Sequence, residues 1–194
     1  MNTMENARLL GEAARDGNVE EIERLLPIVT SMDHRTYALQ WAAEEGQIWS
    51  LRALLPFSDP RVNNSWALHC AAKNGHTQCV KLLIPVSDPK SSKALMQAVK
   101  NNNMDCVKLL LPVSDPQLDN SAVLQISALE NLKDMMDILF DVCDAQVALT
   151  ALQNDYPEKP AAGEALQEKI NQRQNKLLRH NIGEQNRAYK SRKI

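Results

Sequence analysis

The sequence predicts an all-α protein that is built from a repeated pair of short helices. Apolar residues make up 44% of its 194 residues, yet aromatic residues make up only 4%, and Ala and Leu are abundant. This composition suits closely spaced helices, because a β-sandwich would draw more on Val, Ile and aromatic side chains. The second observation is an internal repeat: the segment CVKLLIPVSDP, which begins at Cys79, returns almost letter for letter from Cys106.

Aligned with itself, the chain contains five units of about 29 residues. Each unit has a leucine, a residue pair three positions later, Gly or Asn four positions after the start of that pair, and a second leucine eight positions beyond. The pairs are Ala13-Ala14, Ala42-Ala43, Ala71-Ala72, Ala98-Val99 and Ser127-Ala128. Agreement of these features in five successive units excludes chance.

Each unit is predicted to form a helix-turn-helix. The first leucine and the residue pair lie at i, i+3 and i+4, which places them on one face of a helix. Gly or Asn then ends this first helix, because both residues tolerate the left-handed backbone conformation. The second helix carries its own apolar stripe, such as Val80, Leu83 and Ile84 in the third unit. Proline is expected to end it in four units, at Pro27, Pro56, Pro85 and Pro112.

The third unit, residues 64–84, resembles an ankyrin repeat. The T-P-L-H-x-A stretch of that family corresponds to residues 66–71 (WALHCA), its Gly-His to residues 75–76, and its V-x-x-L-L to residues 80–83 and the apolar residue that follows. The resemblance covers roughly residues 6–144. It implies an ankyrin-like helical-repeat solenoid of about five units, in which neighbours stack because a lone helix pair cannot bury its apolar face.

Two departures from the family pattern concern the connections between units. The Thr-Pro dipeptide is absent from every unit, and the repeat is shorter than the family's usual length of about 33 residues. The missing residues fall where the family places a projecting β-hairpin. We therefore expect shortened loops built on the Ser-Asp-Pro turns at residues 58–60, 87–89 and 114–116.

The chain is expected to divide into an ankyrin-like array at 1–144, a capping helix at 145–155, a linker at 156–160 and a helical, basic tail at 161–194. Residues 1–157 hold 13 Lys/Arg and 20 Asp/Glu, a net charge of −7, whereas residues 158–194 hold 9 and 4, a net charge of +5. A thin apolar stripe in the tail, Leu166, Ile170 and Leu177, either docks on the last repeats or pairs with a second copy.

The sequence offers no recognisable catalytic, cofactor-binding or metal-binding set. It contains no P-loop, no dinucleotide-binding fingerprint and no Gly-x-Ser-x-Gly motif, and its four cysteines form no Cys-x-x-Cys pair. Cys79 and Cys106 occupy equivalent repeat positions, which predicts packing as small apolar side chains. The resemblance implies that His69 ties neighbouring loops. We therefore expect no enzyme, no cofactor and no metal.

The resemblance further implies a partner-binding concave face, formed by one side of the first helices. Its predicted residues are Arg15, Asp16, Thr36, Tyr37, Glu44, Glu45, Ser65, Trp66, Lys73, Asn74, Ser92, Lys100, Asn101 and Glu130. Tyr37 and Trp66 stand where the family has threonine. They are either exposed anchors for a partner or fillers of space beside the shortened loops. Trp41 and Trp49 are expected to face the core.

These features predict a non-catalytic protein–protein interaction module, an adaptor or an inhibitor that binds and occludes a partner protein. Near-identical repeats, frequent in bacterial, phage and large-virus ankyrin-like proteins, suggest by analogy a host–pathogen or phage–host contest. The alternatives are a nucleic-acid-associated protein that uses the basic tail, and a structural protein that self-assembles through it.

Location and oligomeric state are predicted only in outline. The N-terminus lacks the features of a signal peptide, and no apolar run approaches the roughly 18 residues of a membrane span. We therefore expect a cytoplasmic protein without membrane contact, with delivery into a host cell left open. The chain is expected to be a monomer or a tail-mediated dimer.

Overall fold

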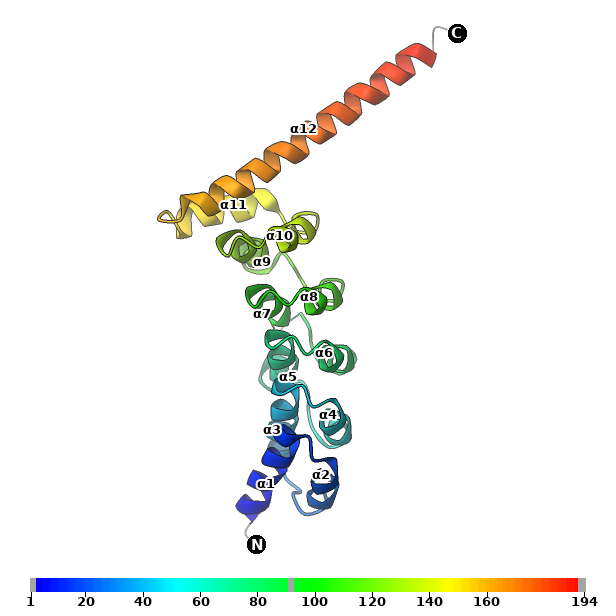
Figure 1. The fold of residues 1–194 in the computed structure, drawn as a ribbon, viewed down its shortest axis with the longest axis vertical. Helices are drawn as coiled ribbons and strands as arrows, with labels where there is room; N and C mark the ends of the chain where they lie inside the picture. Colours follow the sequence, from blue (N-terminus) through cyan, green and yellow to red (C-terminus); the bar gives the residue numbers. More distant parts are fainter. Residues whose placement is uncertain (1–2, 91–92, 192–194) are drawn as a thin grey trace. The chain divides into compact units, whose positions relative to one another are not determined.

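A computed structural model describes residues 3–90 and 93–191 of the chain. All regular secondary structure among these residues is helical (Figure 1). The helices group into two compact units, Met1–Pro116 and Gln117–Ile194. The predicted all-α helical-repeat fold is confirmed.

In its described residues, the first unit consists of four helix pairs. In each pair the first helix is at least as long as the second. The first helices are α1 (Thr3–Asp16), α3 (Met32–Glu44), α5 (Val62–Lys73) and α7 (Ala94–Lys100). The second helices are α2 (Val19–Leu25), α4 (Ile48–Leu54), α6 (Thr77–Leu83) and α8 (Met104–Leu110). Within this unit, the first helices stack in one layer and the second helices in another, so each pair covers the apolar side of its neighbour (Figure 1).

The core of the first unit consists of the repeated leucines and alanines. Leu39, Ala42 and Ala43 of α3 are fully buried, and the equivalent residues of α1, α5 and α7 are buried as well. The leucines of the second helices complete this core; they are Leu25, Leu54, Leu83 and Leu110. The alanines matter because their small side chains let neighbouring first helices approach closely. The repeat pattern in the sequence is thus the pattern of burial.

The first helices end at the predicted glycines. Gly46 follows α3 with φ of +74°, a conformation that side chains other than glycine rarely adopt. A Cβ atom at Gly46 would also lie 2.5 Å from Nδ1 of His76 in the next repeat. In the fourth repeat Asn102 takes this place, with φ of +56°. The turn therefore needs both the left-handed backbone and room for the neighbouring side chain.

A side chain from each following repeat reaches the last carbonyl groups of the preceding first helix. These carbonyl groups have no partner within their own helix. The three bonds run from Gln47 Nε2 to the Arg15 oxygen (3.1 Å), from His76 Nε2 to the Glu44 oxygen (2.8 Å) and from Asn103 Nδ2 to the Lys73 oxygen (2.8 Å). Because a carbonyl only accepts, His76 carries a proton on Nε2. We call these three contacts the carbonyl clamps.

The connections between repeats are short, and their prolines end the second helices. Pro56 lies in the 3₁₀ turn η1 (Leu55–Phe57), directly after α4, and Pro85 lies in η2 (Ile84–Val86), directly after α6. The aspartates of the Ser-Asp-Pro turns accept from backbone amides two residues ahead: Asp59 from Arg61 (2.9 Å) and Asp88 from Lys90 (3.2 Å). No residue described in these connections forms a hairpin strand, which confirms the predicted shortened loops.

A buried hydroxyl near the start of a first helix binds the loop that follows its own helix pair. Thr36 Oγ1 accepts from the backbone amide of Asp59 at 3.1 Å, and Ser65 Oγ accepts from that of Asp88 at 2.8 Å. In the second unit, Ser121 Oγ accepts from the amide of Asp144 at 3.2 Å. The position is equivalent in these three repeats, so the hydroxyl satisfies an amide that the turn leaves without a helical partner.

The second unit contains the fifth helix pair and the tail. Its helices are α9 (Leu118–Leu129), α10 (Lys133–Phe140), α11 (Ala145–Asp155) and α12 (Pro160–Ser191). Asp144 caps α11 by accepting from the amides of Gln146 and Val147, both at 3.0 Å. Pro160 opens α12, where its missing amide costs nothing.

The first part of α12 packs on α11 and α9, whereas the middle part is exposed. Leu166 and Ile170 are buried as members of the predicted stripe, but Leu177, its third member, is exposed. The helix continues to Ser191. In the described part of the chain, no helix is both long enough and apolar enough to cross a bilayer.

Replacing Thr36 by valine should lower the free energy of unfolding by about 1 kcal/mol, because the shape of the side chain is kept while the Asp59 amide loses its acceptor. Urea unfolding followed by circular dichroism measures the change. Thr150→Val is the matched control, since the Thr150 hydroxyl is exposed and bonds only to its own helix, at the Gln146 oxygen. Equal losses in both variants would contradict the proposed role of Thr36.

Candidate functional site

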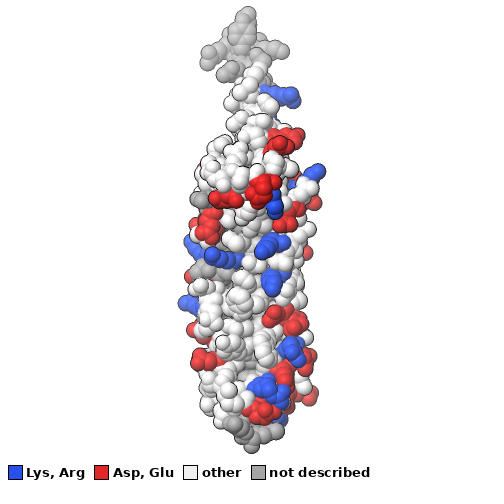
Figure 2. All heavy atoms as spheres, turned by 90° about the vertical axis from the view of Figure 1, so that its left-hand side faces the viewer, with Lys and Arg blue, Asp and Glu red and all other residues white. Residues whose placement is uncertain are grey.

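The first helices of the first unit, α1, α3, α5 and α7, together expose one surface, which we call the first-helix face (Figure 2). A line of charged side chains runs along this face of the unit, beside a largely uncharged strip. Most of the predicted binding residues belong to this face. The contacts that they make within the protein decide which of them remain available to a partner.

The helix-end residues of the predicted row are exposed. In the first unit these are Arg15, Asp16, Glu44, Glu45, Lys73, Asn74, Lys100 and Asn101. Each pair stands where a first helix ends, at α1, α3, α5 and α7 in turn. Glu130, which follows α9 in the second unit, is exposed as well. Their role as partner contacts remains a prediction.

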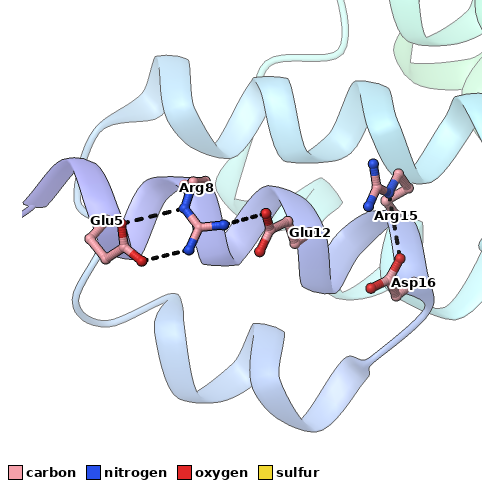
Figure 3. Close-up of polar contacts among 5 residues, drawn as sticks. All are labelled: Glu5, Arg8, Glu12, Arg15 and Asp16. Carbon is pink, nitrogen blue, oxygen red and sulfur yellow. Dashed lines mark hydrogen bonds and ion pairs between the residues drawn. The ribbon is translucent and has the colours of Figure 1, made fainter.

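Several of these side chains also bind within the protein. Asn74 Nδ2 donates to the Glu44 carbonyl at 2.8 Å, and Asn101 Nδ2 donates to the Gln97 carbonyl at 2.9 Å. Arg15 and Asp16 form an exposed ion pair at 3.5 Å (Figure 3). Asn74 is therefore oriented by the end of α3 in the preceding repeat, and Asn101 by its own helix α7, before a partner arrives.

Thr36 and Ser65 were predicted in the exposed row, and this placement is wrong. Thr36 is 3% exposed and Ser65 is fully buried, because both hydroxyl groups face the loop amides that they bind. Ser65 closes a left-handed turn in which Asn63, Asn64 and Ser65 all have φ between 54° and 58°. Ser92, predicted at the equivalent position, lies outside the described residues.

Tyr37 and Trp66 are exposed on the first-helix face, at 58% and 44% of their surface. Trp66 stacks on His69, one helical turn further along α5, with ring centroids 4.5 Å apart and planes inclined by 15°. This contact holds the Trp66 ring in place while leaving much of it open to solvent. The sequence left open whether these two residues are exposed or fill space beside the shortened loops, and in the structure both are exposed.

Trp41 and Trp49 were expected to face the core, and both expectations are wrong. Trp41 of α3 is 38% exposed, and it covers Gly11 of α1 so closely that a Cβ atom there would lie 2.6 Å from the ring. Trp49 of α4 is 68% exposed, with the Arg52 guanidinium 5.5 Å from its ring centroid. Gly11 was the sequence signal for the position of Trp41. The next two repeats have Gln40 and His69 where the first has glycine, so the Trp41 ring can lie against the α1 backbone.

The charges of α1 are paired along one side of the helix. Arg8 lies between Glu5 and Glu12 and forms ion pairs with both (Figure 3). The hydrogen bond and the charge of Arg8 lower the pKa of Glu5. All three side chains are exposed or half-buried, so the cluster contributes little to stability. Arg8 is the one Lys or Arg among the described residues that line the surface hollow beside Tyr37 and Trp41, and the two glutamates neutralise its charge.

In the second unit the tail helix is joined to α10 by charge. Lys169 pairs with Asp137, and Arg173 pairs with Asp141 while its guanidinium lies 5.6 Å from the Phe140 ring centroid. Beyond these contacts the described side chains at 171–182 are exposed, and they include Lys176 and Arg179. An open hollow of about 550 Å³ lies beside the start of α12, lined by residues such as Leu152, Tyr156 and Gly163.

The cysteines show packing rather than reactivity. Cys70, Cys79 and Cys106 are buried, which confirms the packing predicted for Cys79 and Cys106. Burial raises the pKa of Cys70 and of Cys79 to about 11, and it also raises the pKa of Cys106. These thiols are therefore protonated and poorly nucleophilic at neutral pH. Among the described residues, no group of three or more His, Cys, Asp or Glu is placed to hold a metal ion.

Comparison with known families matches the repeat region. A family model described as "Ankyrin repeats (3 copies)" matches residues 52–120 and again residues 68–151. Together these matches cover just over half of the chain and include repeats of both compact units. No curated protein matches the chain by sequence.

The buried thiols predict the reaction with Ellman's reagent. In the native chain near pH 8, Cys143 alone should react fast, because the other three of the four cysteines are buried and protonated. The fast phase should vanish in Cys143→Ala, and all four thiols should react after unfolding in guanidinium chloride. Fast release of more than one equivalent from the native chain would contradict the burial of the others.

Proposed function

Because the chain belongs to the ankyrin repeat family, we propose that it binds a partner protein through its first-helix face and acts as an adaptor or as an occluding inhibitor. Ankyrin repeats are protein–protein interaction modules, and they are in general not catalytic. The observation that carries the choice of face is the exposure of three large aromatic side chains, Tyr37, Trp41 and Trp66, on one side of α3 and α5.

The aromatic side chains supply the main energy for this binding. A large apolar side chain gains about 1.5–3 kcal/mol when it passes from water into a packed contact. Aromatic residues in the centre of an interface commonly carry most of its affinity. Trp66 rests on His69 and Trp41 rests on α1, so little side-chain freedom remains to be lost on binding.

The charged row beside the aromatic residues supplies orientation. Its sign changes along the unit, from Glu44 and Glu45 at the end of α3 to Lys73 and Lys100 at the ends of α5 and α7. A partner that places cations opposite the acidic end of this row and carboxylates opposite its basic end is steered into one register. A partner with the same signs facing the row is repelled. The shortened loops leave the helices themselves as the contact surface.

The inhibitor form of the proposal needs only that the face cover a site on the partner, and the adaptor form needs a second contact elsewhere on the chain. A host–pathogen or phage–host contest remains the setting suggested by the near-identical repeats. The activity of the captured partner distinguishes the two forms, because a saturating amount of an inhibitor abolishes that activity whereas an adaptor does not.

The tail supports a second candidate function, binding of nucleic acid. Lys176 and Arg179 are exposed on α12 beside the amides of Asn171, Gln172 and Gln174. Basic side chains contact phosphates, and amides can bind base edges. This candidate is separate from the first-helix face.

If the tail binds nucleic acid, Lys176→Glu with Arg179→Glu should weaken binding to labelled DNA and RNA at low salt at least about tenfold, measured by fluorescence anisotropy. The control pair, Arg52→Glu with Lys81→Glu, makes the same charge change on exposed second-helix positions. Absence of salt-sensitive binding by the intact chain would remove this candidate.

The first-helix face is tested by affinity capture with the intact chain and with a variant carrying Glu44→Ala, Trp66→Ala and Lys73→Ala. The captured partner should be lost by this variant, because it removes an anchor and both signs of charge. The control variant carries Glu20→Ala, Trp49→Ala and Lys81→Ala, which are the same residue types exposed on second helices. Circular dichroism checks that both fold. Retention of the partner by the first variant and loss by the control would place the site on the second helices.

A further inference from the structure

A hollow of about 210 Å³ opens on the first-helix face between α1 and α3. Its lining consists of Met4, Ala7, Arg8, Gly11, His34, Tyr37, Ala38 and Trp41. Most of these side chains are apolar or aromatic, and Met4, Tyr37 and Trp41 are all exposed at its rim. The hollow is smaller than the roughly 300–1,000 Å³ of pockets that enclose drug-sized ligands. Its size suits a single side chain.

One wall of the hollow depends on a side chain that the first repeat lacks. Gly11 lies within α1 at the position where α3 has Gln40 and α5 has His69. Its missing Cβ lets the Trp41 ring lie against the α1 backbone, where an added Cβ atom would meet ring atoms at 2.6 and 2.8 Å. The indole thus forms one wall, and Tyr37, one helical turn earlier in α3, forms the next.

The surroundings of the hollow are acidic. The segments 3–16 and 32–45 hold six carboxylates and three guanidinium groups, a net charge of −3. All three cations are already engaged: Arg8 pairs with Glu5 and Glu12, Arg15 pairs with Asp16, and Arg35 donates to the carbonyls of Val29 and Leu26 at 2.6 and 2.8 Å. The potential at the rim therefore favours a cation on a partner.

We propose that this hollow is the specificity site of the module, and that it receives one large apolar side chain from a partner segment that carries Lys or Arg beside it. The inference rests on the proposed function and deepens it. The apolar side chain fills the space between Met4, Tyr37 and Trp41. The neighbouring cation lies over the exposed aromatic rings, where cation–π attraction and the carboxylates act together.

The requirement for a cation on the partner distinguishes this proposal from nonspecific apolar binding to an aromatic patch. An apolar segment flanked by Asp or Glu would gain the same contact with Trp41, but it would meet Glu44 and Glu45 with like charge. Salt should therefore weaken binding of the basic segment, because the charges are exposed and become screened.

The experiment pans a phage-displayed library of random peptides on the immobilised full chain and measures the affinity of a synthetic peptide with the enriched sequence. The enriched sequences should pair a large apolar residue with an adjacent Lys or Arg. Trp41→Ala should weaken the synthetic peptide at least about tenfold. Glu44→Gln with Glu45→Gln should weaken it a few-fold at low salt and change little at high salt.

Glycine substitutions provide a matched pair. Gly11→Ala should weaken the peptide at least about tenfold, because the added methyl group displaces the Trp41 ring. Gly163→Ala makes the same change within α12, where the nearest side-chain atoms lie 3.9 Å from the added Cβ, and should leave the affinity unchanged. Circular dichroism and urea unfolding confirm that each variant is folded.

The outcomes separate this inference from the proposed function. Enriched sequences without a cation, unchanged affinity in both Trp41→Ala and Gly11→Ala, or no enrichment at all would each overturn the inference. If the natural partner is nevertheless lost by the triple variant at Glu44, Trp66 and Lys73, the first-helix face keeps its role and only the hollow is dismissed. If the partner survives that variant too, the proposed function fails as well.

Discussion

The structure of the first unit depends on the carbonyl clamps that join each helix pair to the next. A first helix ends with carbonyl groups that its own hydrogen bonds cannot reach, and in this array the next repeat supplies the donor. The clamp also explains the glycines, because Gly46 must leave room for the His76 ring that crosses to Glu44. One contact thus joins the end of a first helix, the glycine that follows it and the neighbouring repeat.

This dependence links the scaffold to the candidate binding face. The clamps bind the ends of α1, α3 and α5, and the exposed charges stand at those same ends. Glu44 takes part in both: its carbonyl accepts from His76 and from Asn74, while its side chain points to solvent. The positions of the charges are therefore set by hydrogen bonds in the backbone rather than by the charges themselves.

The sequence was sufficient for the repeats, because leucine, alanine and glycine spacing reports burial and backbone conformation directly. Leu39, Ala43 and Gly46 could be placed from the pattern alone. The site was harder. Thr36 and Ser65 are small and polar, so the pattern suggested an exposed row, whereas their hydroxyl groups bind amides of a loop 23 residues away. That contact needs the shortened connection, whose course no periodicity describes.

Trp41 was misplaced for the opposite reason. Its position within α3 is typical of packing, and it does pack, but against a helix in which Gly11 removes the usual side chain. The departure from the repeat pattern, Gly11, lies in the repeat before that of Trp41. Comparison of the residues within one repeat therefore does not reveal it.

The clamps have a consequence for how such a gene changes. Each clamp joins only adjacent repeats, and both of its halves, the donor and the helix end, lie within the second repeat and again within the third. A duplicated unit therefore arrives with a donor for the repeat before it and carbonyl groups for the repeat after it. The near-identity of the segments from Cys79 and from Cys106 is what such an event leaves behind. Gain or loss of a unit of this kind changes the length of the array's surface, while the new junction has both halves of the same hydrogen bond.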